Sequence, residues 1–147
     1  MARGSHMKER YGGQSGSFAL SLAEFAQQAT EAIDASLREI VIELGGSLIR
    51  MSPVDTGRFR GNWQFSVDTP ASGTLDEADP SGSAATARLI GDSIAFRAGE
   101  SAFIVNNLPY AIPLEFGHSD QSPGGMVRIT VARFQQIVLE AIRNNQV

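Results

Sequence analysis

The 147-residue sequence has no cysteine, which excludes disulfide bonds and thiolate ligands to a metal. Histidine is almost as scarce: His6 and His118 are the only two, and they do not stand at the spacing of metal ligands. We therefore expect no zinc site and no cofactor. Long apolar runs are missing too, because no stretch approaches the ~20 apolar residues that cross a bilayer. We expect no contact with a membrane.

Lysine is the third scarce residue. Lys8 is the only lysine among the 12 basic residues, and the net charge is −4. Because phosphate neutralisation needs clustered cations, this acidic balance argues against a general nucleic-acid binder. The other basic residues are all arginine, whose planar guanidinium suits bidentate pairing at interfaces. GC-rich codon usage explains the same bias equally well.

The length of the chain predicts one domain with a real core. The opening "MARGSH" is typical of an expression scar. The stretch "YGGQSGS" (11–17) is rich in glycine and serine, as flexible segments are. We therefore expect residues 1–18 to be a scar followed by a disordered segment, and residues 19–147 to form the domain.

One long helix is predicted between Ser21 and Pro53. Ser21 and Glu24 form a capping-box pattern at its start, and the proline ends it. Its ~28 residues make a rod of roughly 42 Å. Such a rod overhangs a small domain. It either lies along a partner or, on the simpler interpretation, curves over a sheet. Apolar residues recur at steps of three and four along one face: Leu22, Phe25, Ala29, Ile33, Leu37, Ile40, Val41, Leu44 and Leu48.

Shorter elements follow the long helix. Alternating apolar residues predict a strand in residues 62–68, residues 83–96 fit a short helix, and residues 101–107 form a second strand. Residues 110–117 are expected to be partly extended, with Pro113 at a sheet edge or a bulge because proline cannot donate to a ladder.

The remaining stretches complete the expected fold. Residues 69–83 are rich in proline, glycine, serine and acidic side chains, which predicts an exposed loop. A last helix is expected to start with Ser122 as its cap and Pro123 in its first turn. Its apolar residues again share one face: Val127, Val131, Phe134, Ile137, Val138, Ala141 and Ile142. Together these elements predict an α+β fold, a small antiparallel sheet packed by a long N-terminal helix and a C-terminal helix, with a short middle helix.

Residues of catalytic type are present but scattered. His118 is followed directly by a serine and an aspartate, whereas a hydrolase triad is a spatial arrangement and not a tripeptide. Asp55 and Glu115 suit acid and base roles only if the fold brings them together. A helix cap for Asp55 and an arginine partner for Glu115 are the simpler roles. We therefore expect no catalytic residue.

Two segments together resemble a known family. The first signature segment, "SPVDTGRFRGNW" (52–63), is similar to the Pro-Val-Asp-Thr-Gly-Arg-hydrophobic-Arg motif of bacteriophage head–tail joining and tail-completion proteins of the minor tail protein Z type. The second signature segment, "IVNNLPYAIPLEFGHSDQSPGGMVRITVARF" (104–134), resembles their Asn-Asn-X-Pro-Tyr-Ala strand, Leu-Glu-aromatic-Gly step and Ser-X-Gln-X-Pro-X-Gly-Met loop. The likeness covers about residues 20–143. It departs at Ser122, where alanine is expected, and at Asp120, where a basic residue is common.

The resemblance implies a set of residues that serve folding or assembly. Asp55 and Thr56 are expected to shape the turn after the first helix, and Gly57 is expected to allow it. Arg58 and Arg60 are expected to pair with Glu115 or with a neighbouring copy. The full set is Pro53, Asp55, Thr56, Gly57, Arg58, Arg60, Asn106, Asn107, Tyr110, Glu115, Gly117, Ser119, Gln121 and Gly125.

Positions of the second segment have expected roles of their own. Tyr110 is expected to pack across the edge strand. Gly117, Gly124 and Gly125 are expected to let the loop turn tightly, which brings the last helix against the sheet. Loss of the Glu115 side chain is expected to harm folding or assembly and not any turnover.

The resemblance also implies a function. It implies a non-enzymatic virion protein of the tail or neck, assembled in the host cytoplasm, that completes the tail and joins head to tail. It implies a ring of copies, usually six, whose neighbours are the tail terminator and head-completion or adaptor proteins, with DNA passing through the bore without specific binding. A negative bore repels the DNA backbone and lets it slide. The alternatives are a DNA-contacting packaging or connector factor and, remotely, a small hydrolase built on Asp55, Glu115 and His118.

Overall fold

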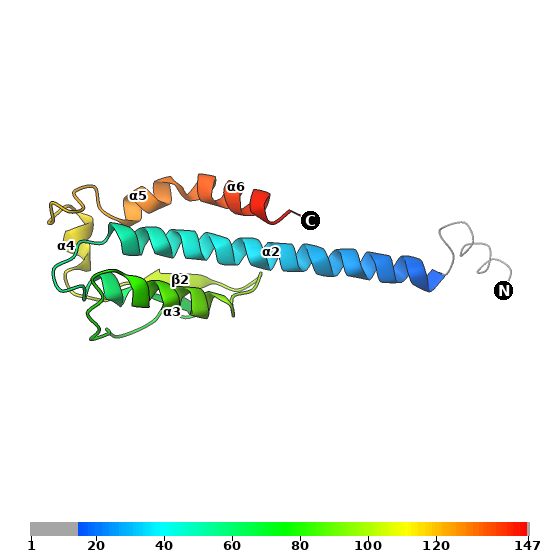
Figure 1. The fold of residues 1–147 in the computed structure, drawn as a ribbon, viewed down its shortest axis with the longest axis horizontal. Coiled ribbons are helices and arrows are strands. Elements are labelled where there is room, and N and C mark those ends of the chain that lie inside the picture. Colours follow the sequence, from blue (N-terminus) through cyan, green and yellow to red (C-terminus); the bar gives the residue numbers. More distant parts are fainter. Residues whose placement is uncertain (1–14, 147) are drawn as a thin grey trace.

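The protein is built around one long helix. The structure is a computed structural model, and it describes residues 15–146 (Figure 1). Helix α2, Ser15–Met51, has 37 residues, and at 1.5 Å per residue it is about 55 Å long. The expected start at Ser21 is therefore wrong: Ser21 and Glu24 lie inside the helix, because the residues before them contain no proline that would stop it.

The early start of α2 also bears on the expected N-terminal segment. Residues 15–18, which the sequence assigns to a disordered segment, form the first turn of the helix. Residues 1–14, with the expected scar, lie outside the described residues.

Two layers flank the C-terminal part of α2 (Figure 1). On one side lie helix α3, Ser83–Ser93, and the antiparallel pair of strands β1, Gln64–Val67, and β2, Ala102–Val105. On the other side lie helices α5, Val127–Ala132, and α6, Phe134–Asn144. The expected α+β fold is confirmed, with the long N-terminal helix, the C-terminal helices and the short middle helix all in place.

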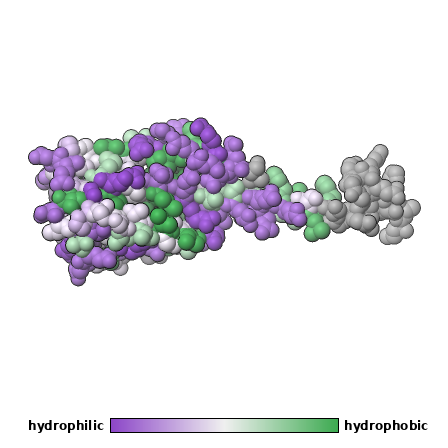
Figure 2. All heavy atoms as spheres, viewed as in Figure 1, coloured by the Kyte–Doolittle hydropathy of each residue, from purple (hydrophilic) through white to green (hydrophobic). Residues whose placement is uncertain are grey.

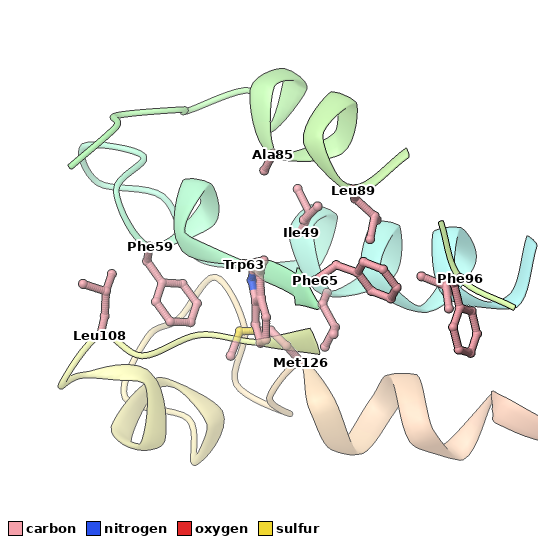
Figure 3. Close-up of a cluster of buried hydrophobic side chains, with 11 residues drawn as sticks. Ile49, Phe59, Trp63, Phe65, Ala85, Leu89, Phe96, Leu108 and Met126 are labelled. Atoms are coloured by element: carbon pink, nitrogen blue, oxygen red, sulfur yellow. The ribbon is translucent and has the colours of Figure 1, made fainter. Parts of the chain in front are cut away.

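The core lies where α2, the sheet and α3 meet (Figure 3). Phe65 of β1 and Trp63, directly before that strand, are buried there, as the alternation in residues 62–68 predicts. Gly45 lets α3 come close, since a Cβ atom at Gly45 would lie 2.5 Å from a methyl carbon of Leu89. The buried apolar cluster consists of Val41, Leu48, Ile49, Phe59, Trp63, Phe65, Ala85, Leu89, Phe96, Leu108 and Met126.

The predicted apolar face of α2 is covered along only part of its length. Val41 and Leu48 are buried, whereas Leu22, Phe25 and Ile33 are 53–60% exposed. Figure 1 shows the cause, because the N-terminal half of α2 projects beyond every other described element. The sequence pattern is continuous, but within residues 15–146 only its C-terminal half is covered by other elements.

The region around Pro113 is helical and not extended. Helix α4, Ala111–Glu115, occupies it. Pro113 is the third residue of this helix, where the backbone N–H would have no intrahelical partner in any case. The expectation of an edge strand fails because proline is tolerated equally well in the first turn of a helix.

The last helix differs from expectation at both its start and its middle. It begins at Val127, while the Ser122 hydroxyl donates to the carbonyl of Gly125 at 3.0 Å. Arg133 interrupts it and separates α5 from α6. The single apolar face is therefore broken: Val131 is 62% exposed, whereas Ile137 is buried.

The acidic loop of residues 69–83 folds against the core. Asp79 is only 7% exposed, and its carboxylate accepts a hydrogen bond from the N–H of Ala85 in the first turn of α3 at 2.9 Å. An anion at this end of a helix satisfies a free donor and opposes the positive end of the helix dipole. The expectation of an exposed loop holds for most of these residues, including Asp76 and Glu77, and is wrong at Asp79, where tertiary contacts turn the carboxylate inward.

Candidate functional site

The two signature segments meet in space. The side-chain amide of Gln121 accepts a hydrogen bond from the Val54 N–H at 2.8 Å and donates to the Val54 carbonyl at 2.9 Å. The Asn106 amide donates to the Phe59 carbonyl at 2.9 Å. Gln121 therefore pairs with both backbone groups of Val54 as a neighbouring strand would, and Asn106 adds one further bond to the backbone of the first segment. We call this set of contacts the clasp.

A cleft of about 460 Å³ lies beside the clasp, and both segments line it. The Tyr110 ring stands 5.9 Å from the Phe59 ring at its wall, so Tyr110 bridges the two segments; the sequence predicts packing across the edge strand instead. The lining residues are Pro53, Val54, Asp55, Thr56, Gly57, Arg58, Phe59, Tyr110, Leu114, Ser119 and Gln121.

The turn after α2 is formed by backbone as much as by side chains. The Thr56 hydroxyl accepts a hydrogen bond from the Arg58 N–H at 3.2 Å. Gly57 has φ +91°, and its carbonyl accepts from the N–H of Gly61 and of Asp79. The roles predicted for Thr56 and Gly57 are confirmed. Asp55 is exposed and, within residues 15–146, accepts no hydrogen bond, so its predicted part in shaping the turn is wrong.

The two signature arginines do not pair with Glu115. The Arg60 guanidinium donates to the carbonyls of Arg50, Ser52 and Pro80 at 2.8–3.1 Å. The first two carbonyls stand at the end of α2, where intrahelical partners have run out. Arg58 forms a salt bridge to the fully exposed Asp76 at 3.5 Å. Arg60 is thus a C-terminal cap of α2, and the predicted pairing with Glu115 is wrong within one copy of the chain.

Glu115 caps helix α5 from outside it. One carboxylate oxygen accepts hydrogen bonds from the N–H groups of Met126 and Val127, both at 2.7 Å. The other accepts from the Arg128 N–H and from its guanidinium, both at 3.0 Å. The side chain is 14% exposed. The predicted arginine partner exists, but it is Arg128, and most of the hydrogen bonds come from the backbone.

These contacts decide the charge of Glu115. Burial raises the pKa of the Glu115 carboxyl. The hydrogen bonds from the N–H groups of Val127, Arg128 and Met126 and from the Arg128 guanidinium together lower the pKa by more than burial raises it. The pKa therefore lies below its ordinary value of 4.5. A folded-state pKa below the unfolded value means that the carboxylate stabilises the fold above the unfolded pKa. That stabilisation is lost as the pH falls through the folded pKa.

We expect this linkage to appear as an acid-sensitive difference between the wild-type protein and a Glu115→Gln variant. The difference in free energy of unfolding between the two is expected to stay constant from pH 7 to about pH 5 and to shrink at lower pH, where the wild-type carboxyl takes up its proton. Urea titrations at several pH values measure it. A difference that grows on acidification contradicts the assigned direction of the pKa.

Two glycines of the second segment adopt conformations that need glycine. Gly117 has φ +87° and Gly125 has φ +84°. A Cβ atom at Gly125 would also lie 2.6 Å from a carboxylate oxygen of Glu115. Ser119 supports the same loop, since its hydroxyl accepts from the Gln121 N–H at 3.2 Å. The predicted tight turn is confirmed at Gly117 and Gly125; Gly124 has no positive φ and lies instead against Ile129.

Asn62 is a functional position that the sequence analysis missed. It is fully buried, and its amide donates to the carbonyls of Arg58 and Leu75 while accepting from the Leu75 N–H at 2.7 Å. It therefore fastens the acidic loop to the first signature segment. Asn107 makes similar contacts with the acidic loop at the surface, where its amide donates to the carbonyls of Ala71 and Gly73. The available signal was a polar residue directly before the buried Trp63.

Burial predicts unequal effects for these two asparagines. Asn62→Ala is expected to lower the free energy of unfolding by about 2–4 kcal/mol, because both backbone groups of Leu75 lose their partner inside the protein. Asn107→Ala is expected to cost about 1 kcal/mol or less, since water replaces the amide. Urea unfolding followed by the fluorescence of Trp63, the only tryptophan, gives both values. Equal losses contradict the role of Asn62.

The residues of the alternative hydrolase do not form one constellation. Asp55 lines the cleft beside the clasp, whereas Glu115 lines a separate one with Phe116 and Met126. The Glu115 carboxylate is occupied by the contacts given above. Across residues 15–146, no three His, Cys, Asp or Glu side chains gather where they would hold a metal ion. None of the described helices combines the length and apolar content needed to cross a membrane.

Comparison with known proteins leaves the family open. The chain matches no protein-family model, no curated protein and no solved structure. The resemblance to phage tail-completion proteins therefore stays a prediction from the two signature segments.

Proposed function

We propose that the protein is a structural component of a bacteriophage neck or tail end, which completes the tail and joins it to the head. The observation that carries this proposal is the clasp. Gln121, Asn106 and Glu115 direct their polar atoms to the backbone of this same chain. A site built for catalysis would direct such atoms toward a reacting group.

The shape of the molecule supports an assembly role. The globular part is held by the clasp and the buried Asn62, whereas the N-terminal half of α2 projects from it with large apolar side chains exposed (Figure 1). Exposed apolar surface of this kind is typical of protein interaction sites. A rigid body with one projecting helix suits a protein that mates with sister copies.

The proposed assembly is a ring around the DNA channel, six copies being the expected number. Its proposed neighbours are the tail terminator and the head-completion or adaptor proteins, and its place is the virion. The net charge of −4 favours DNA that slides through the bore without specific binding.

The proposal is tested with a phage from which the gene for this protein has been deleted. Electron microscopy is expected to show separate heads and tails, and addition of the wild-type protein is expected to restore joined, infectious particles. An Asp55→Ala/His118→Ala double variant is the matched control, because it removes both freestanding groups of the alternative hydrolase. It is expected to restore joining fully. Normal infectious particles without the protein, or failure of the double variant alone, would overturn the proposal.

A further inference from the structure

The projecting half of α2 carries an uncovered apolar stripe. Phe18, Leu22, Phe25 and Ile33 are 53–62% exposed, and with Ala29 they follow one another at steps of three and four, which places them on one face. We call these five residues the projecting stripe. Figure 2 shows apolar and polar residues side by side on this part of the helix.

An apolar groove lies between α2 and α6. It has a volume of about 530 Å³, and no charged side chain lines it. Helix α6 runs back along α2 here, since the Ser36 hydroxyl approaches the Ala141 carbonyl at 3.4 Å. The groove is lined by Ala29, Ala32, Ile33, Ser36, Leu37, Ile40, Val138, Ile142, Asn145 and Gln146. The projecting stripe and this groove therefore overlap at Ala29 and Ile33, at the C-terminal end of the stripe.

The charges beside the stripe are all negative. Between Ser15 and Leu37 the helix carries Glu24, Glu31 and Asp34 and no basic residue. Asp34 forms a salt bridge with Arg97, but Glu24 and Glu31 have no such partner within residues 15–146. Two projecting halves lying side by side would therefore bring like charges together.

The α6 wall of the groove has the opposite balance of charge, whereas the α2 wall carries both Arg38 and Glu39, and the Glu39 carboxylate accepts a hydrogen bond from the Asn144 amide at 3.1 Å. Arg133 and Arg143 flank the apolar face of α6 against a single acid, Glu140. Neither arginine forms a salt bridge within the described part of the chain. An acidic helix is therefore attracted to this flank, and opposite charges across an interface set orientation as well as attraction.

From these features we infer that the projecting stripe of one copy docks in the α2–α6 groove of a second copy. The contact joins two different patches, so after pairing one copy keeps a free groove and the other keeps a free stripe. Such head-to-tail contacts build rings where the rotation closes and filaments where it does not. The inference rests on the proposed function for its occupant, a sister copy, and it names the surfaces through which the copies meet.

The amount of apolar surface is adequate for such a contact. An aromatic side chain buries roughly 150–250 Å², and stable interfaces bury about 800 Å² on each partner. The stripe contributes two phenylalanines and two large aliphatic side chains. Phe25 is the expected anchor, because it stands near the middle of the stripe and large aromatic residues dominate interface energies.

The test uses two exposed positions, one on each patch. Phe25→Asp places a charge on the stripe, and Ile142→Asp places one in the groove; the side chains are 60% and 49% exposed, so both variants are expected to fold. By sedimentation velocity, the wild-type protein is expected to self-associate, and each variant to do so at least roughly tenfold more weakly. Mixing the two variants is expected to restore one intact contact and to give a 1:1 heterodimer that grows no further.

Two matched controls stand on the same helices outside the patches. Leu20→Asp and Leu139→Asp change side chains that are 66% and 54% exposed but line neither the stripe nor the groove. Both are expected to self-associate like the wild type. Association is also expected to weaken as salt is raised, because part of the attraction is between exposed charges.

Several outcomes would overturn the inference. A wild-type protein that stays monomeric at its solubility limit would do so, as would an Ile142→Asp variant that associates normally. Failure of the mixed variants to pair would exclude docking of stripe on groove. These measurements use purified protein alone. If Phe25→Asp particles still join heads to tails, this contact is excluded while the proposed function stands. The deletion experiment tests the function without reference to the contact.

Discussion

Replacing Gly57 with alanine is expected to lower the free energy of unfolding by about 4 kcal/mol. Gly57 has φ +91°, a conformation that is unfavourable by about 1–2 kcal/mol for a residue with a Cβ atom. The new Cβ would also lie 2.6 Å from the carbonyl carbon of Asp79 and 2.7 Å from the Cα of Pro80. Because both are backbone atoms, no side-chain rotation relieves the overlap, and overpacking of this kind adds about 1–3 kcal/mol.

Gly73 provides a matched control for Gly57. It has φ +80°, but no atom lies within 4 Å of the place where its Cβ would be. Gly73→Ala is expected to cost about 1 kcal/mol, the conformational part alone. Urea unfolding followed by Trp63 fluorescence measures both variants. If the two losses are equal, the close approach of the acidic loop to the signature turn does not contribute to stability.

Glu115→Ala is expected to lower the free energy of unfolding by about 3 kcal/mol. The substitution leaves three N–H groups at the start of α5 without an acceptor, and hydrogen bonds to a charged group contribute about 1.5–3 kcal/mol each where water does not replace them. Water is expected to reach the exposed Val127 and Arg128 but not Met126, which is 1% exposed. The loss is therefore smaller than the sum of the bonds.

Arg128→Ala separates the two parts of the Glu115 site. It removes the guanidinium, whose side chain is 54% exposed, and leaves the backbone donors in place. An exposed salt bridge contributes about 0–1 kcal/mol, so this variant is expected to lose much less than Glu115→Ala. A loss as large as that of Glu115→Ala contradicts the view that Glu115 acts mainly as a helix cap.

The Gly57 variant tests how the first signature segment is held, and the Glu115 variant tests how the second is held. Gly57 holds the first signature segment against the acidic loop, and Glu115 holds the second against α5. The clasp through Gln121 and Asn106 joins the two segments. The signature positions are therefore explained by the folding of a single copy. The surfaces inferred to join copies, the projecting stripe and the α2–α6 groove, lie elsewhere.

The amino-acid sequence alone determined the class of the fold and most of its elements. Periodicity found the long helix, the middle helix and both strands, because the spacing of apolar residues records which face of an element is buried. The glycines of the two signature segments also predicted the turns at Gly57, Gly117 and Gly125, since a positive φ is nearly a property of glycine alone.

Only the tertiary structure decided which groups meet and which faces stay uncovered. Asp79 is buried, Arg60 caps α2, and Glu115 caps a helix that begins twelve residues after it in the chain. Such partners are chosen by distance in space, which local patterns do not record. The same limit applies to α2: its apolar face is continuous in the sequence, but the described elements cover only its C-terminal half, because they do not extend far enough along the helix to reach the rest.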